Sequence, residues 1–165
     1  MKNMIASVVA AASICAAPTA LAETWSPTGN GVTGPDPFEV RQHFTVICEL
    51  DAATSANGSS LQITSLNISA GSFGSTLFCP NFYFSGLPYN VEPDPATSLT
   101  SVVIQGVLFQ GFSGTCAGNL KADFDQSTGE LTFSHVNTLP PISGAIPCSF
   151  EGIVTTTPAL SYTVP

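Results

Sequence analysis

Alternation of apolar and polar residues with a period of two is the feature that most restricts the fold of this chain. The clearest apolar set is Phe38, Val40, Phe44, Val46, Cys48 and Leu50, and the residues between them are mostly polar, with Ile47 as an exception. Successive side chains of a strand point to opposite faces, so this pattern predicts a half-buried antiparallel strand. We expect that strand over residues 38–50, and a polar loop over residues 51–60.

The rest of the chain has the same short, alternating character. Leu61 and Ile63 are out of phase with Leu66 and Ile68, which predicts a β-bulge or a turn near Ser65. Further strands are expected at residues 76–78, 81–84, 89–91, 100–109, 119–124, 131–136, 150–156 and 161–164. Glycine and proline separate most of them. No stretch has the spacing of an amphipathic helix, so we predict a single all-β domain, an antiparallel β-sandwich or barrel.

The N-terminus has the order of a secretory signal peptide. Lys2 precedes an apolar run over residues 4–17, and small residues at 20–22 suit signal peptidase. We predict cleavage after Ala22, which leaves a β-domain over residues 23–165 and a secreted or periplasmic location. Lipid attachment at Cys15 is disfavoured, because Ile14 is too large for the position before a lipidated cysteine. No second hydrophobic span follows, so no membrane span is expected.

Four of the five cysteines lie beyond the predicted signal peptide: Cys48, Cys79, Cys116 and Cys148. An even number of cysteines in an exported chain predicts two disulfides. A zinc site is the alternative, but the chain has no Cys-x-x-Cys pair and no histidine close to these cysteines. Four cysteines allow three pairings, and the count alone does not choose between them.

A weak internal likeness bears on that pairing. The intervals from Cys48 to Cys79 and from Cys116 to Cys148 are nearly equal in length, and each contains a similar strand and precedes a similar tail. Two related halves, residues 23–93 and 99–165, are one interpretation of this likeness, and chance among β-strands is the other. If the halves are related, each contains its own disulfide.

The charge balance argues against nucleic acid and anionic membranes as partners. Eleven acidic residues stand against three basic ones, for a net charge of −8, and one of the basic residues is in the predicted signal peptide. Such a surface repels nucleic acid and anionic membrane surfaces. We therefore expect no nucleic-acid partner.

Candidate catalytic groups are few. The two histidines, His43 and His135, are both expected on strands, and no Gly-x-Ser-x-Gly elbow accompanies them. Two carboxylate pairs at a spacing of two, Glu49 with Asp51 and Asp123 with Asp125, are expected on solvated strand faces. A glycosidase would also need aromatic platforms, and Trp25 is the only tryptophan. We predict that the protein is not an enzyme and uses no cofactor.

The segment 123–130 resembles a calcium-binding loop, with oxygen-bearing side chains at alternate positions and a glycine. Its glycine comes one position late, and the loop lacks the final acid of the twelve-residue pattern. A polar segment with glycine between two strands is also what a hairpin turn requires. We favour the hairpin and predict no metal site.

Three apolar runs depart from alternation: residues 82–84, 102–104 and 107–109. Strands that are apolar on both faces are either covered on both sides or exposed as a hydrophobic surface. The first case is ordinary core packing. The second predicts contact with a hydrophobic small molecule or association with further copies of the chain.

Short motifs along the chain resemble those of the exported bacterial activators of alkane oxidation, the PraB-like family. The motifs are Trp25-Ser26-Pro27, Thr45-Val46-Ile47-Cys48, Leu77-Phe78-Cys79-Pro80, Gly86-Leu87-Pro88-Tyr89, Gly114-Thr115-Cys116-Ala117-Gly118, Gly129-Glu130-Leu131-Thr132 and Ile146-Pro147-Cys148. The resemblance implies an extracellular, non-enzymatic protein associated with growth on long-chain alkanes and with the biofilm matrix. It supplies no catalytic residues.

Three functional hypotheses follow. The first is an exported accessory protein that helps hydrophobic substrates such as alkanes reach the cell. The second is a structural protein of a biofilm matrix or surface fibre, without a ligand. The third, a hydrolase, ranks last because no set of residues supports it.

Overall fold

The structure is a computed structural model that describes residues 24–72, 74–94, 100–144 and 146–163. The predicted signal peptide and its cleavage site after Ala22 lie outside the described residues. The described part of the chain is built from β-strands and one short 3₁₀ helix, η1. The elements are β1 (Thr24–Ser26), β2 (Gly29–Arg41), β3 (Thr45–Ala56), β4 (Leu61–Ser69), η1 (Cys79–Asn81), β5 (Tyr83–Ser85), β6 (Tyr89–Pro93), β7 (Ser101–Gly111), β8 (Gly114–Asp125), β9 (Glu130–Phe133), β10 (Thr138–Leu139), β11 (Cys148–Thr157) and β12 (Ser161–Thr163).

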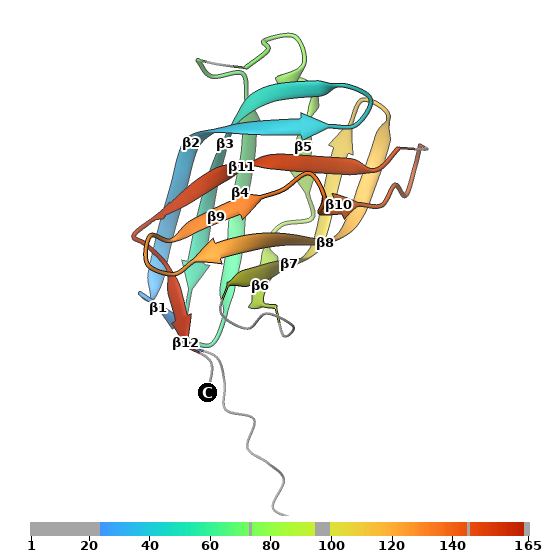
Figure 1. The fold of residues 1–165 in the computed structure, drawn as a ribbon. Helices are drawn as coiled ribbons and strands as arrows, with labels where there is room; N and C mark the ends of the chain where they lie inside the picture. Colours follow the sequence, from blue (N-terminus) through green and yellow to red (C-terminus); the bar gives the residue numbers. More distant parts are fainter. Residues whose placement is uncertain (1–23, 73, 95–99, 145, 164–165) are drawn as a thin grey trace, which may run out of the picture.

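The main sheet closes on itself as an antiparallel barrel. Its strands follow the order β11, β2, β3, β4, β6, β7, β8 and β9, and pairing of β9 with β11 completes the circle (Figure 1). β5 is attached to β7 and β10 to β11, while β1 and β12 form a separate pair at one end. The all-β prediction is confirmed, and of the two predicted architectures the barrel is the one formed.

Inward-facing aromatic residues fill the barrel. Phe38, Phe109 and Phe150 are fully buried, and the ring centroids of Phe109 and Phe150 are 4.9 Å apart. At the end that carries β1 and β12, the ring of Trp25 packs against Tyr162 at 4.9 Å. Strand alternation places all of these side chains in the interior. Each such ring buries roughly 150–250 Å², so they account for a large part of the core.

The predicted bulge near Ser65 is confirmed. The register between β3 and β4 runs from Ala53 opposite Ser65 to Thr54 opposite Ile63, which leaves Thr64 as the extra residue. The extra residue explains the change of phase along the sequence, since it moves later side chains to the other face.

Four expected element boundaries are wrong. Residues 38–50 form a hairpin rather than one strand, because the chain turns at residues 42–44. The predicted loop 51–60 is mostly strand: β3 continues to Ala56, and its inward side chains are too small to give a strong hydrophobic period. Residues 76–78 form turns before η1, and β9 ends at Phe133, so His135 lies outside it.

Both disulfides are present, between Cys48 and Cys79 and between Cys116 and Cys148, with Cα–Cα distances of 5.7 and 6.0 Å. This is the pairing that the two-half interpretation predicts. Strands from both proposed halves form one barrel, joined where β6 pairs with β7 and where β11 pairs with β2. Relatedness of the halves themselves stays a prediction.

Candidate functional site

The two histidines lie at the surface in different elements. His43 is exposed in the turn between β2 and β3. His135 follows β9, and its Nδ1 is 3.2 Å from Oε2 of Glu151. The same carboxylate oxygen accepts a hydrogen bond from Nη2 of Arg41 at 3.1 Å. This arrangement is a surface ion cluster, and surface ion pairs contribute little to stability.

One of the carboxylate pairs differs from the expectation. Glu49 is buried rather than solvated, and it accepts the backbone N–H of Ser72 at 2.6 Å.

Hydrogen bonds from the hydroxyl and the backbone N–H of Ser127 lower the pKa of the Asp125 carboxyl. In the backbone register of β8 and β9, Asp125 lies opposite Glu130 across the turn. Segment 123–130 is therefore the predicted hairpin. Among the described residues, no group of three or more His, Cys, Asp or Glu side chains could hold a metal ion.

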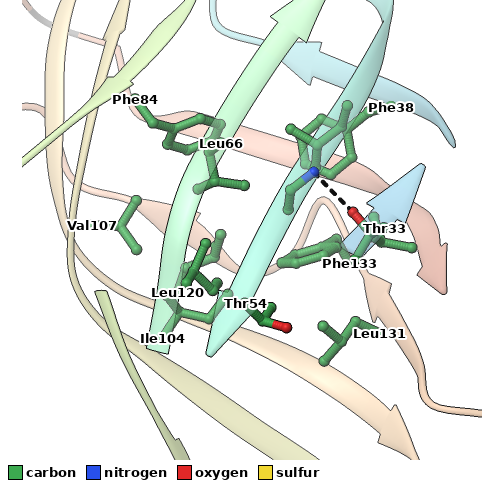
Figure 2. Close-up of a pocket in the computed structure, with 14 residues that line it drawn as sticks. Thr33, Phe38, Thr54, Leu66, Phe84, Ile104, Val107, Leu120, Leu131 and Phe133 are labelled. Atoms are coloured by element: carbon green, nitrogen blue, oxygen red, sulfur yellow. Dashed lines mark hydrogen bonds between the residues drawn. The ribbon is translucent and has the colours of Figure 1, made fainter. Parts of the chain in front are cut away.

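The barrel interior holds a small apolar cavity of about 30 Å³ (Figure 2). Leu66 and Phe84 lie at one side of it, and Thr54 lines both this cavity and a neighbouring one of about 10 Å³. Ligand pockets typically enclose about 300–1,000 Å³. The interior is therefore a packed core with room for about one water molecule, and it does not accommodate an alkyl chain.

A cluster of partly exposed aromatic side chains lies at the end of the barrel opposite β1 and β12. It is formed by Phe44, Phe78 and Phe112, and we call it the aromatic end. Phe44 is in the β2–β3 turn and Phe112 in the β7–β8 turn, which lie together at the upper right of Figure 1. Phe78 immediately precedes η1. The three ring centroids are 5.2 to 5.8 Å apart, so the rings form one cluster.

The aromatic end is exposed although it is apolar. Phe44 and Phe112 are each 46% exposed, and Phe82 joins the cluster to the core through a ring contact of 5.3 Å with Phe112. A groove of about 460 Å³ runs beside it, lined by Phe44, Thr45, Val46, Ile47, Gly74, Ser75 and Phe78. None of these described lining residues is charged. Exposed apolar surface of this kind makes the aromatic end a candidate contact site for apolar ligands or partners.

A second groove of about 350 Å³ lies beside β9 and β11, but it differs in chemistry. Its lining includes His135 and Glu151, members of the surface ion cluster. Covering those charges with hydrocarbon would remove their hydration without replacing it, which is costly. The aromatic end is therefore the better candidate for an apolar ligand.

Sequence reasoning missed Phe44 and Phe112 as surface residues. Phe44 was expected to face inward within one continuous strand, but the turn places it at the surface. One signal was available: Gln42 stands where the alternation calls for an apolar residue, which marks the break in the strand. For Phe112, the following Ser113-Gly114 indicates a turn but not exposure.

The sequence was compared with known families, curated proteins and solved structures. The family described as "Alkane oxidation protein activator PraA/PraB-like" matches residues 1–164. The chain belongs to this family. The family resemblance drawn from the cysteine-containing motifs is thus confirmed. No curated protein and no solved structure was found to match this member of the family. No helix in its described residues is long and apolar enough to cross a membrane.

Proposed function

We propose that this member of the alkane oxidation activator family is an exported, non-enzymatic accessory protein that helps cells use hydrophobic substrates by placing its aromatic end against hydrocarbon. The observation that carries the proposal is the cluster of Phe44, Phe78 and Phe112 beside an uncharged groove. Family membership supports the link to alkanes.

The physical chemistry of the aromatic end favours hydrocarbon over water. Removing apolar surface from water yields about 25 cal/mol per Å², and the half-exposed rings of Phe44 and Phe112 offer such surface without a charge to desolvate. The net charge of −8 keeps the remaining surface hydrated and opposes contact with anionic lipid. Uncharged hydrocarbon is the partner that suits both properties.

Contact at the surface, rather than storage inside the barrel, follows from the volumes. The interior cavity of about 30 Å³ is an order of magnitude smaller than the outer groove of about 460 Å³. We therefore place the substrate outside the barrel. Two disulfides and the sequence of residues 1–22 support export, and a mature protein beginning at Glu23 would establish the cleavage site.

The direct test measures interfacial tension at a hexadecane–water boundary. We expect the wild-type protein to lower it, and a Phe44→Ser/Phe112→Ser variant to need at least about tenfold more protein for the same effect, the equivalent of about 1.4 kcal/mol. The matched control, Val136→Ser/Ile153→Ser, removes two apolar side chains that are 72% and 53% exposed, and Ile153 lines the other groove. Equal behaviour of the two variants would contradict a specific role for the aromatic end.

A cellular test separates this function from a matrix role. Deletion of the gene in the source bacterium should slow growth on hexadecane but not on a soluble carbon source, and the Phe44→Ser/Phe112→Ser variant should not restore it. Equal growth on both carbon sources, with concentration-dependent fibres from purified protein, would favour the structural matrix protein instead.

A further inference from the structure

The two disulfides join different kinds of structure, although the sequence separations of 31 and 32 residues are nearly equal. Cys116–Cys148 connects β8 with the first residue of β11, and both strands are also held by their neighbours in the barrel. Cys48–Cys79 connects β3 with η1, which is not part of the barrel wall. Cys79 directly follows Phe78 in the sequence.

Residues 74–82, which we call the η1 segment, are bonded mainly to themselves. Within the described structure, the backbone N–H groups of Phe78 and Cys79 both donate to the carbonyl of Ser75, and that of Phe82 donates to Cys79. Such local bonds shape the η1 segment but do not fix its position against the barrel.

Anchors to the barrel lie at both sides of Phe78. Upstream, the N–H of Ser72 donates to Glu49 on β3. Downstream, Phe82 is buried and its ring is 5.9 Å from that of Phe109 on β7. Between them, the disulfide is the covalent attachment, and its cysteines are fully buried. Loss of this bond would free the middle of the η1 segment while both anchors keep it near the barrel.

We propose that Cys48 and Cys79 are positioning residues for the hydrocarbon site: their disulfide holds Phe78 against Phe44 and Phe112 without touching the ligand. This inference rests on the proposed function of the aromatic end. The geometry supports it directly, since Phe78 is one residue from Cys79 and its ring is 5.2 Å from Phe44 and 5.5 Å from Phe112. Preorganisation of this kind strengthens binding because less ordering remains to be done when the ligand arrives.

The test uses the full secreted domain and dissolved octane, followed through the NMR signals of the phenylalanine rings. The positioning variant is Cys48→Ala/Cys79→Ala, and the matched control is Cys116→Ala/Cys148→Ala, which removes the other buried disulfide of similar span. Circular dichroism and thermal unfolding identify any variant that fails to fold. We expect octane to bind at least about tenfold more weakly to the positioning variant and within about twofold of wild type to the control.

A coupling measurement separates positioning from general loosening of the fold. Phe78→Ala should weaken octane binding in the wild-type protein but change it little in the Cys48→Ala/Cys79→Ala background, where Phe78 is already displaced. Additive losses, or unchanged affinity on removal of Cys48–Cys79, would overturn the positioning role. If the wild-type protein itself fails to bind octane, the proposed function fails first, and the two outcomes are thereby distinguished.

Discussion

Gln42 bridges to Ser113 across the aromatic end: its side-chain Oε1 accepts the backbone N–H of Ser113 at 2.9 Å. Its Nε2 donates to the carbonyl oxygen of Gly114 at 3.3 Å. The two hydrogen bonds join the β2–β3 turn to the β7–β8 turn. Gly111 leaves room for this contact, since a Cβ there would lie 2.5 Å from Oε1 of Gln42. The residue that breaks the alternation of the sequence thus fastens together the turns that carry Phe44 and Phe112.

Replacing Gln42 with alanine should loosen this connection. We expect Gln42→Ala to lower the free energy of unfolding by about 1–3 kcal/mol, because each of the two hydrogen bonds contributes about 0.5–1.5 kcal/mol net. We also expect weaker octane binding. Urea denaturation and NMR titration measure the two effects. Gln105→Ala is the control, because that side chain also donates a hydrogen bond, to Glu92 at an exposed site away from the aromatic residues. If both variants behave alike, the bridge has no special role.

The disulfides give a second prediction, on stability. In the chain-entropy model a closed loop of about 30 residues stabilises the fold by about 3–4 kcal/mol. The two spans of 31 and 32 residues should therefore contribute almost equally. Denaturation of the two double-alanine variants measures this, and we expect similar losses of stability but different losses of octane binding. A large difference in stability would mean that strain or residual structure dominates instead.

The elements that the sequence predicts well are those with large inward side chains. The alternation of Phe38 with Val40 and of Val46 with Cys48 correctly predicts extended structure on both sides of the missed turn, and the change of phase after Ile63 locates the bulge. The continuation of β3 to Ala56 was missed because small inward residues give a weak hydrophobic signal. Closure into a barrel also depends on the pairing of β9 with β11, a long-range contact that no local pattern encodes.

The candidate site was only partly predictable, for a related reason. Cysteine count and export predict disulfides, but the apolar runs at residues 82–84, 102–104 and 107–109 mostly supply core side chains rather than the aromatic end. The aromatic end, however, combines three segments distant in sequence, and only the closed barrel brings Phe44 close to Phe112. Exposure of a phenylalanine depends on what covers it in three dimensions, which period-two patterns do not specify.

Tyr89 provides a prediction on pH. Burial raises the pKa of its phenol above the usual 10.0, although hydrogen bonds with the backbone of Leu108 and Ser85 oppose part of this rise. The folded state therefore holds this proton at a pH where the unfolded chain releases it, so the stabilisation is complete below pH 10 and is lost as the pH rises through the folded pKa. We expect the free energy of unfolding to fall above about pH 10.

The matched variants for this test are Tyr89→Phe and Tyr83→Phe, the latter at a side chain that is 53% exposed. Tyr89→Phe should lower stability at neutral pH, because hydrogen bonds are lost, and should flatten the decline above pH 10. Tyr83→Phe should leave that decline in place. Denaturation at a series of pH values decides between these outcomes, and an unchanged slope for Tyr89→Phe would assign the decline to other groups.

Two buried threonines on neighbouring strands give predictions of opposite sign. Among the described residues, Thr54 is the one whose buried side-chain oxygen has no hydrogen-bond partner, whereas Oγ1 of Thr33 accepts the backbone N–H of Ala52 at 3.0 Å (Figure 2). Thr54→Val should raise the free energy of unfolding by about 1 kcal/mol, because it removes a buried polar group that is unpaired. Thr33→Val should lower it by about 1–3 kcal/mol, because it leaves the N–H of Ala52 unpaired.

Urea denaturation of both variants measures the difference in sign. Valine replaces the hydroxyl with a methyl group of similar shape, so packing changes little and the comparison isolates the hydrogen bond. If Thr54→Val is instead as destabilising as Thr33→Val, the hydroxyl of Thr54 has a partner in solution. The apolar cavity beside it has room for about one water molecule, which would then be a structural part of the core.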